Sequence, residues 1–192
     1  CGVDGIELDV HLSSDGVPVV IHDATVDRTT NGTGTVLSMS YAELQKLDAG
    51  HGERIPSLSQ AVELIAPHAT LFIEIKAPDM EQAVLDILKP YRNRGEFIIK
   101  AFNHRHLLNL RNLDSYIPLA ALIVGLPLDP GHIVHSFNGN MLSVSTKTID
   151  QQLVEDCHRD GLDVCTWNCN DPSQVEMFRQ LDVDWLATDR PS

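Results

Sequence analysis

Residues 5–11 read Gly-Ile-Glu-Leu-Asp-Val-His, and apolar and polar side chains alternate from Ile6 to His11. Successive side chains of a β-strand point to opposite faces of the sheet, so the residues at even positions share one face. That face is aliphatic, whereas Glu7, Asp9 and His11 share the other face. The pattern is typical of a strand that packs against helices on one side and lines the mouth of a barrel on the other.

The same kind of β-rich run recurs along the chain and alternates with longer amphipathic stretches. The predicted strands are residues 5–11, 71–76, 97–102, 119–124, 141–145, 163–167 and 184–187. The predicted helices are residues 57–65, 80–91, 104–113, 130–137, 150–159 and 172–180. Strands that alternate with helices at this spacing form a parallel sheet covered by helices, so the fold class is α/β.

Two α/β architectures fit this alternation, a closed barrel and an open doubly wound sheet. A (β/α)8 TIM-type barrel needs eight strands and has about 250 residues. The chain offers seven predicted parallel strands in 192 residues. We expect one barrel domain over residues 1–192 that lacks the first strand and helix and the last helix. A missing strand exposes sheet edges, which further residues or a neighbouring chain in an oligomer would have to cover.

The stretch after the first strand departs from the alternation. Asp15-Gly16 is a strong turn signal, and a second β-like run follows at residues 17–21. A Gly- and Thr-rich stretch at residues 28–34 and a short helix near residues 40–47 come next. We predict an insertion at about residues 12–50, and insertions at that end of a barrel strand commonly build the active site.

The composition excludes several classes of protein. The 14 basic and 27 acidic side chains give a formal net charge of −13, which argues against a nucleic-acid partner because phosphate backbones are bound through surplus Lys and Arg. The four cysteines have no zinc-type spacing, so we expect reduced, mostly buried thiols. No apolar run is long enough for a membrane span. The lack of disulfide spacing favours the cytoplasm, and a periplasmic or secreted location stays open.

Two neighbouring predicted strands carry acidic side chains on their polar faces. Glu7 and Asp9 lie about 7 Å apart on an extended strand and repel each other by about 2 kcal/mol in a partly screened site. On the next strand, Glu74 and Lys76 alternate with isoleucines. Three negative charges and one positive charge on one face leave −2, which one divalent cation neutralises. Oxygen ligands favour Mg²⁺, Ca²⁺ or Mn²⁺ over zinc. The alternatives are a solvated edge strand and an internal Glu74–Lys76 ion pair.

Two further residues stand out, and each has a structural alternative. His22 ends the second β-like run beside Asp23, and an imidazole suits proton transfer at neutral pH. A lone histidine is nevertheless more often structural. Trp167 ends the predicted strand at residues 163–167, with Cys165 and Cys169 on the same face. It fits a core position as well as it fits a wall that packs on substrate carbons.

These residues and their neighbours closely resemble the bacterial glycerophosphodiester phosphodiesterases. The resemblance rests on GVDGIELDV at residues 2–10, DGVPVVIHD at 15–23, DRTTNG at 27–32, IEIK at 73–76, TWN at 166–168 and TDRP at 188–191. The first three motifs are the most specific, because the carboxylate pair, the turn, the histidine and the Thr-rich loop occur in order at the family's spacing. The family's His-Arg-Gly motif, which supplies a second catalytic histidine, does not occur among these 192 residues.

The resemblance implies a (β/α)8 barrel that hydrolyses glycerophosphodiesters to glycerol 3-phosphate and an alcohol with one divalent cation, Mg²⁺ or Ca²⁺, with Mn²⁺ as a third option. The functional residues that it implies are the metal ligands Glu7, Asp9 and Glu74, the acid/base residue His22, the phosphate contact Lys76 and the glycerol-pocket residue Trp167. Two alternatives stay open. One is a non-catalytic barrel that keeps the cation site, and the other is a related phosphodiesterase of the lysophospholipase D type.

Overall fold

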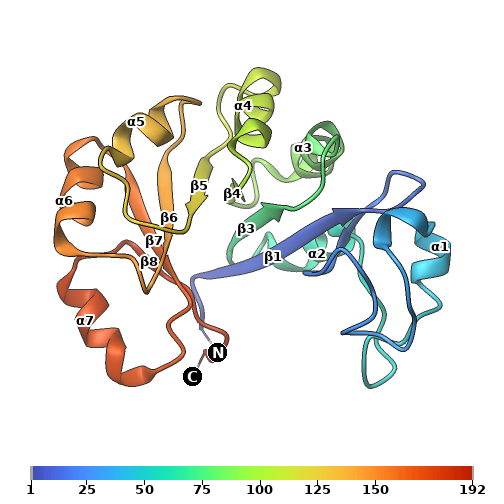
Figure 1. Cartoon of the computed structure of the whole chain (residues 1–192). Helices are drawn as coiled ribbons and strands as arrows, with labels where there is room; N and C mark the ends of the chain where they lie inside the picture. Colours follow the sequence, from blue (N-terminus) through green and yellow to red (C-terminus); the bar gives the residue numbers. More distant parts are fainter. Residues whose placement is uncertain (1, 192) are drawn as a thin grey trace. The chain divides into compact units, whose positions relative to one another are not determined.

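The computed structural model describes residues 2–191, which fall into two compact units. One unit comprises residues 4–98, and the other comprises residues 99–191 together with residues 2 and 3. The division falls within the strand β4 (Phe97–Ala101). Each unit contains strands and helices in alternation, coloured along the chain in Figure 1.

The unit of residues 4–98 is built on three strands. β1 (Gly5–Leu12) pairs in parallel with β3 (Thr70–Ile75) over the full length of β3, and Figure 1 shows the two strands side by side. β2 (Pro18–Val20) turns back and pairs antiparallel with β1. The parallel register aligns Asp9 with Glu74, so two of the acidic positions are neighbours across the ladder.

The chain between β1 and α2 (Leu58–Ile65) forms an excursion with its own small core. Gly16 in the β1–β2 turn has a φ of 79°, which glycine adopts without the steric cost of a side chain. The 3-10 helix η1 (Val36–Ser38) and the one-turn helix α1 (Tyr41–Leu44) follow β2. The buried apolar side chains of the excursion are Val19, Ile21, Val26, Val36, Leu44 and Ile55. This cluster fixes the end of β2, from which the chain continues to His22.

Helices α2 and α3 (Glu81–Leu88) complete this unit. α2 begins at a capping box in which the Ser57 and Gln60 side chains each accept a backbone N–H of the other residue. The single helix predicted after residue 80 is instead divided into α3 and the 3-10 turn η2 (Lys89–Tyr91). Pro90 explains the division, because proline lacks the N–H group that would continue the α-helical hydrogen bonds.

The unit of residues 99–191 contains a parallel sheet in the order β4-β5-β6-β7-β8. Its other strands are β5 (Leu119–Ile123), β6 (Met141–Ser145), β7 (Asp163–Trp167) and β8 (Trp185–Leu186). Its helices are α4 (His104–Leu113), α5 (Pro130–His135), α6 (Gln151–Arg159), the 3-10 helix η3 (Pro172–Gln174) and α7 (Val175–Gln180). Figure 1 shows α5 and α6 on the same side of the strands, and α5 packs against β5 and β6 while α6 packs against β7.

The alternation predicted from the sequence is confirmed, since a strand occurs at each of the seven predicted places. The differences lie at the ends of elements. β8 has only two residues, because it pairs with β7 alone among the described strands. α1 has four residues, fewer than the predicted helix near residues 40–47. α5 ends at His135 instead of residue 137, and Asn138 beyond it has a left-handed φ of 51°. None of the described helices combines the length and apolar character needed to span a membrane.

Candidate active site

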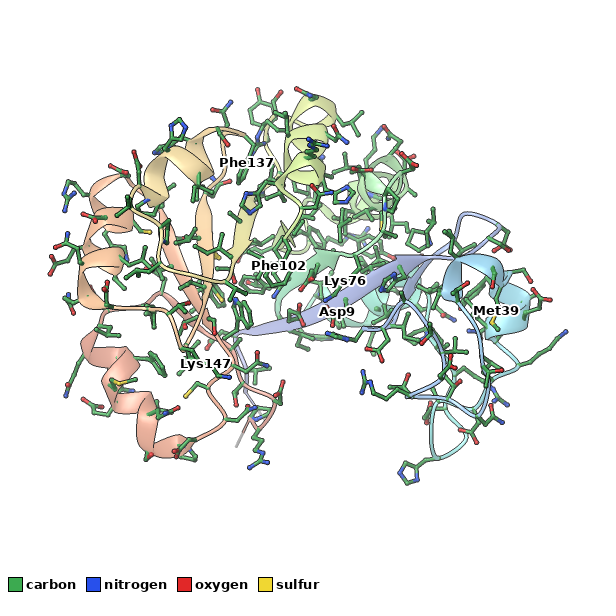
Figure 2. All side chains as sticks on the ribbon, viewed as in Figure 1. Asp9, Met39, Lys76, Phe102, Phe137 and Lys147 are labelled. Atoms are coloured by element: carbon green, nitrogen blue, oxygen red, sulfur yellow. The ribbon has the colours of Figure 1, made fainter. Side chains whose placement is uncertain are left out.

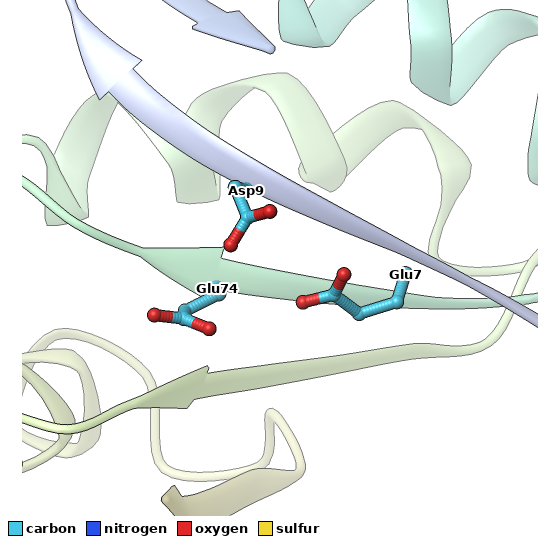
Figure 3. Close-up of side chains that lie close together, drawn as sticks. All are labelled: Glu7, Asp9 and Glu74. Atoms are coloured by element: carbon cyan, nitrogen blue, oxygen red, sulfur yellow. The ribbon is translucent and has the colours of Figure 1, made fainter. Parts of the chain in front are cut away.

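Three carboxylates from two adjacent strands meet in the unit of residues 4–98. Glu7 and Asp9 come from β1 and Glu74 comes from β3, because strand alternation places positions 7 and 9 on one face and the register aligns Asp9 with Glu74. One oxygen atom from each residue lies within 4.8 Å of the other two. Figure 3 shows the three carboxylates turned toward a shared space. The structure thus brings together the three acidic residues that the strand pattern groups.

Lys76 lies beside two of these carboxylates. Its Nζ is 3.1 Å from Oδ1 of Asp9 and 2.8 Å from Oε1 of Glu74, and Figure 2 labels Lys76 close to Asp9. The side chains of Lys76, Asp9 and Glu74 are only 20%, 18% and 8% exposed. Burial works to lower the pKa of Lys76, but the ion pairs with Glu74 and Asp9 outweigh it and raise the pKa above its ordinary value. Lys76 is therefore a cation at neutral pH. The Glu74–Lys76 ion pair that the sequence offered as an alternative is present, and Lys76 forms a second ion pair with Asp9.

The charge of this group matches a hard cation. The formal charges of three carboxylates and one ammonium group sum to −2. Glu7 is exposed and Glu74 is buried, so the group extends from the surface into the protein. Its possible metal ligands are all carboxylate oxygens, which suit Mg²⁺, Ca²⁺ or Mn²⁺ better than zinc. The arrangement can hold one divalent cation, and Lys76 can offer positive charge to a neighbouring phosphate.

His22 follows β2, and its backbone is held to β1. The N–H of Ile21 donates to the carbonyl oxygen of Asp9 at 3.0 Å, and Nε2 of His11 donates to the carbonyl oxygen of His22 at 3.1 Å. The His22 side chain is 61% exposed, and its Nδ1 donates to Oδ1 of Asp23 at 2.6 Å. The backbone of His22 is thus tied to the strand that carries two of the carboxylates, while its ring is accessible to a ligand.

Trp167 ends β7 and belongs to the unit of residues 99–191, unlike the other predicted site residues. Its ring meets the half-exposed Phe102 edge to face, with centroids 5.8 Å apart. Its indole Nε1 is buried and has no hydrogen-bond partner among the described residues. The contact is compatible with both interpretations of Trp167, a residue of the core and a residue that packs against the carbon atoms of the substrate. The described cysteines, Cys157, Cys165 and Cys169, are buried thiols outside any disulfide, as predicted, and Cys1 lies outside the described residues.

Two buried polar residues received no functional role from the sequence, His11 on β1 and Lys100 on β4. His11 is buried, and burial lowers its pKa despite the hydrogen bond to His22 that works in the opposite direction. Lys100 on β4 is also buried and shares a strand face with Phe102. The lysine inside the apolar run FIIKAF is a signal that the sequence offers, because a lysine is rarely buried unless its charge is paired.

Known proteins with similar sequences point to one family. The glycerophosphoryl diester phosphodiesterase family matches residues 1–192. A glycerophosphodiester phosphodiesterase from Caldanaerobacter subterraneus subsp. tengcongensis is 36% identical over 203 aligned positions, which cover 99% of this chain and 84% of the relative. A glycerophosphodiester phosphodiesterase from Bacillus altitudinis is 28% identical, and the alignment covers 99% of this chain and 84% of the relative.

Solved structures agree with the sequence comparison. An Oleispira antarctica phosphodiesterase in complex with the product sn-glycerol-3-phosphate has a TM-score of 0.93 and 28% identity, with 99% of this chain and 83% of that chain covered. A glycerophosphodiester phosphodiesterase from Agrobacterium tumefaciens has a TM-score of 0.86 and 28% identity, with 99% and 86% covered. These matches confirm the predicted TIM-type (β/α)8 barrel fold. With its site geometry, its sequence and its fold in agreement, the chain belongs to the glycerophosphoryl diester phosphodiesterase family of enzymes.

Proposed function

We propose that the protein hydrolyses glycerophosphodiesters to glycerol 3-phosphate and an alcohol, in a reaction that requires a divalent cation. The observation that carries the proposal is the convergence of Glu7, Asp9 and Glu74 within 4.8 Å in a chain of this family. The Oleispira antarctica relative supports the product, since that phosphodiesterase was solved in complex with sn-glycerol-3-phosphate.

The residues fit a hard divalent cation, and Glu7, Asp9 and Glu74 would hold it. Each of the three offers a carboxylate oxygen, the ligand type that Mg²⁺ and Ca²⁺ prefer and that Mn²⁺ also accepts. When bound, the cation supplies positive charge to the phosphoryl oxygens, where negative charge develops during the reaction. Lys76 supports the site through its ion pairs with Asp9 and Glu74, because its ammonium group offsets part of the negative charge that the carboxylates bring together.

Three other residues have roles in the proposed reaction. In the proposed step His22 acts as the imidazolium: Nδ1–H stays bonded to Asp23, and the proton on Nε2 passes to the oxygen of the departing alcohol, which leaves the ring as the neutral Nδ1–H form. Lys76 binds a phosphoryl oxygen, and Trp167 packs on the glycerol carbons. In the family, the histidine of the His-Arg-Gly motif is the second acid/base residue, and none of the described residues is assigned to the activation of the nucleophile.

Hydrolysis of glycerophosphocholine, followed through the release of choline, tests the proposal. We expect EDTA to abolish turnover and added Mg²⁺ or Ca²⁺ to restore it. Glu7→Gln keeps the size of the side chain but removes its charge, and it should abolish the cation-dependent turnover. Glu63→Gln on α2 is the matched control, because Glu63 is also exposed and lies outside the carboxylate group. Unchanged turnover in Glu7→Gln would overturn the assignment of Glu7.

The same assay separates the enzyme from its alternatives. It should be run on this chain and on a chain extended at the N-terminus, because the family's His-Arg-Gly motif is not among the 192 residues. Calorimetric titration with Mg²⁺ and Ca²⁺ reports cation binding independently of turnover. Cation binding without turnover in both chains would indicate the non-catalytic barrel. Turnover of lysophosphatidylcholine without turnover of glycerophosphocholine would indicate the lysophospholipase D alternative.

A further inference from the structure

A chain of three polar side chains leads away from His22 into the Thr-rich loop. Nδ1 of His22 donates to Oδ1 of Asp23 at 2.6 Å. The guanidinium of Arg28 donates from Nε to Oδ2 of Asp23 at 2.6 Å and from its terminal nitrogen Nη2 to Oδ1 at 2.9 Å. The Asp23 carboxylate is therefore held on both oxygens, one of which it shares between the imidazole and the guanidinium.

We propose that Asp23 is a positioning residue that fixes the ring orientation and tautomer of His22, and that Arg28 holds Asp23 in place for this purpose. The inference rests on the proposed function, in which His22 is the proton donor. It extends that function to two residues of the loop that follows β2, neither of which belongs to the carboxylate group.

The need for such a residue follows from how His22 is held. The contacts through Ile21 and the His22 carbonyl oxygen fix the backbone, but they leave the ring free to rotate. The His22 side chain is 61% exposed, so packing does not select one rotamer. A bond from Nδ1–H to Asp23 selects both the rotamer and the tautomer, and it leaves Nε2 as the nitrogen that faces a ligand.

Asp23 needs support of its own because it neighbours His22 in sequence and is itself partly exposed. A fork of two N–H groups from Arg28 binds both oxygens of the carboxylate, which fixes the plane of the group as a lysine could not. The pKa of Asp23 lies well below its ordinary value. The hydrogen bonds from Arg28 contribute most to this shift, and the hydrogen bond from His22 contributes next. Asp23 therefore remains an acceptor over the whole neutral pH range.

The tautomer of His22 can be measured directly by ¹⁵N NMR of the imidazole nitrogens at a pH where the ring is neutral. In the wild type we expect the Nδ1–H tautomer, because the Asp23 carboxylate accepts a hydrogen bond from Nδ1–H. In Asp23→Asn the side-chain amide can donate to Nδ1, so we expect the Nε2–H tautomer. Arg28→Lys should leave a mixture of the two, because the fork is lost while the charge stays. An unchanged tautomer in Asp23→Asn would overturn the proposal.

The kinetic readout uses the same variants. Asp23→Asn should lower kcat for glycerophosphocholine by at least about 100-fold with little change in KM, the range for loss of general acid–base catalysis. Arg28→Lys should lower kcat by about tenfold, as supporting residues of a site commonly do. Asp27→Asn is the control, since Asp27 accepts the Gly34 N–H in the same loop without contacting His22. A loss in Asp27→Asn equal to that in Asp23→Asn would show that the loop fold alone is responsible.

The two readouts separate this inference from the proposed function. If His22→Ala retains full turnover, the role of His22 as proton donor fails, and the NMR result still reports whether Asp23 sets the tautomer. If His22→Ala is inactive while Asp23→Asn keeps both the wild-type tautomer and full kcat, the proposed function stands and the positioning role of Asp23 is wrong.

Discussion

The Nζ of Lys76 lies 2.8 Å from Oε1 of Glu74, two residues earlier on the same face at the end of β3. The pair is largely buried, and the same ammonium group also bonds Asp9. A buried carboxylate without a cation is costly, because it loses the hydration that it has in the unfolded chain. Lys76 therefore stabilises the carboxylates in the protein without a metal ion, and a bound divalent cation would share that role.

Replacing Lys76 with methionine should make stability depend on divalent cations. Lys76→Met keeps the length of the side chain but leaves Asp9 and Glu74 without their ammonium partner. We expect a loss of about 3 kcal/mol, the lower end of the range for breaking a buried pair, because the group is partly solvent-exposed. Mg²⁺ or Ca²⁺ should raise the melting temperature of the variant more than that of the wild type. Equal shifts in both proteins would contradict the prediction, and Lys46→Met, at a lysine outside the site, is the control.

The carboxylate group shows how far sequence reasoning reaches. The period of two along β1 and β3 is fixed by backbone geometry, so the shared face of Glu7 and Asp9 and the pairing with Glu74 follow from the alternation. The position of the Lys76 ammonium between Asp9 and Glu74 does not follow from it, because a lysine has four rotatable side-chain bonds and no fixed reach. The boundaries of α1 and β8 also escape the pattern, since they depend on tertiary pairing.

The Asp23–Arg28 pair could not be predicted for a different reason. The strand alternation stops after β2, and the loop that carries Arg28 has no regular period. Its course is set by individual contacts, such as the bond from the Gly34 N–H to Asp27 and the packing of Val26 in the small core of the excursion. Sequence patterns predict such contacts only where a turn type demands particular residues.

Trp167 offers a test between its two interpretations. Trp167→Phe keeps an aromatic ring against Phe102 but removes the larger indole. If the indole packs on the glycerol carbons, KM for glycerophosphocholine should rise by about tenfold, in line with the loss of one or two apolar contacts. The melting temperature should then change little, because the buried Nε1 makes no hydrogen bond within the described residues. A large drop in melting temperature with an unchanged KM would show that Trp167 is a core residue.

Gly95 should be intolerant of any side chain. A Cβ atom at this position would lie 2.8 Å from the carbonyl oxygen and 2.9 Å from the Cβ of Ala66, which follows α2. The oxygen belongs to the backbone and cannot move without disturbing the end of that helix. We expect Gly95→Ala to cost about 1–3 kcal/mol, the usual range for overpacking, as measured by urea unfolding. Asn93→Ala, an exposed position of the same loop, should cost less than about 0.5 kcal/mol.

Cys157 should make the protein sensitive to high pH. Burial, followed by repulsion from Asp156, Asp160 and Asp184, raises the pKa of its thiol from 9.0 to about 12. The folded state therefore keeps the proton between these values while the unfolded state loses it, so this contribution to stability is complete below pH 9.0 and is lost as the pH rises toward 12.

Urea unfolding at pH 8 and pH 10 measures the effect, and Cys157→Ala should lose less stability between the two pH values than the wild type does. Iodoacetamide gives an independent readout, because only the thiolate reacts. Native Cys157 should stay unmodified at pH 8.5 and react once urea unfolds the chain. Labelling of Cys157 in the native protein at the rate of a free thiol would show that the residue is reached by solvent, and the predicted pH dependence would then be wrong.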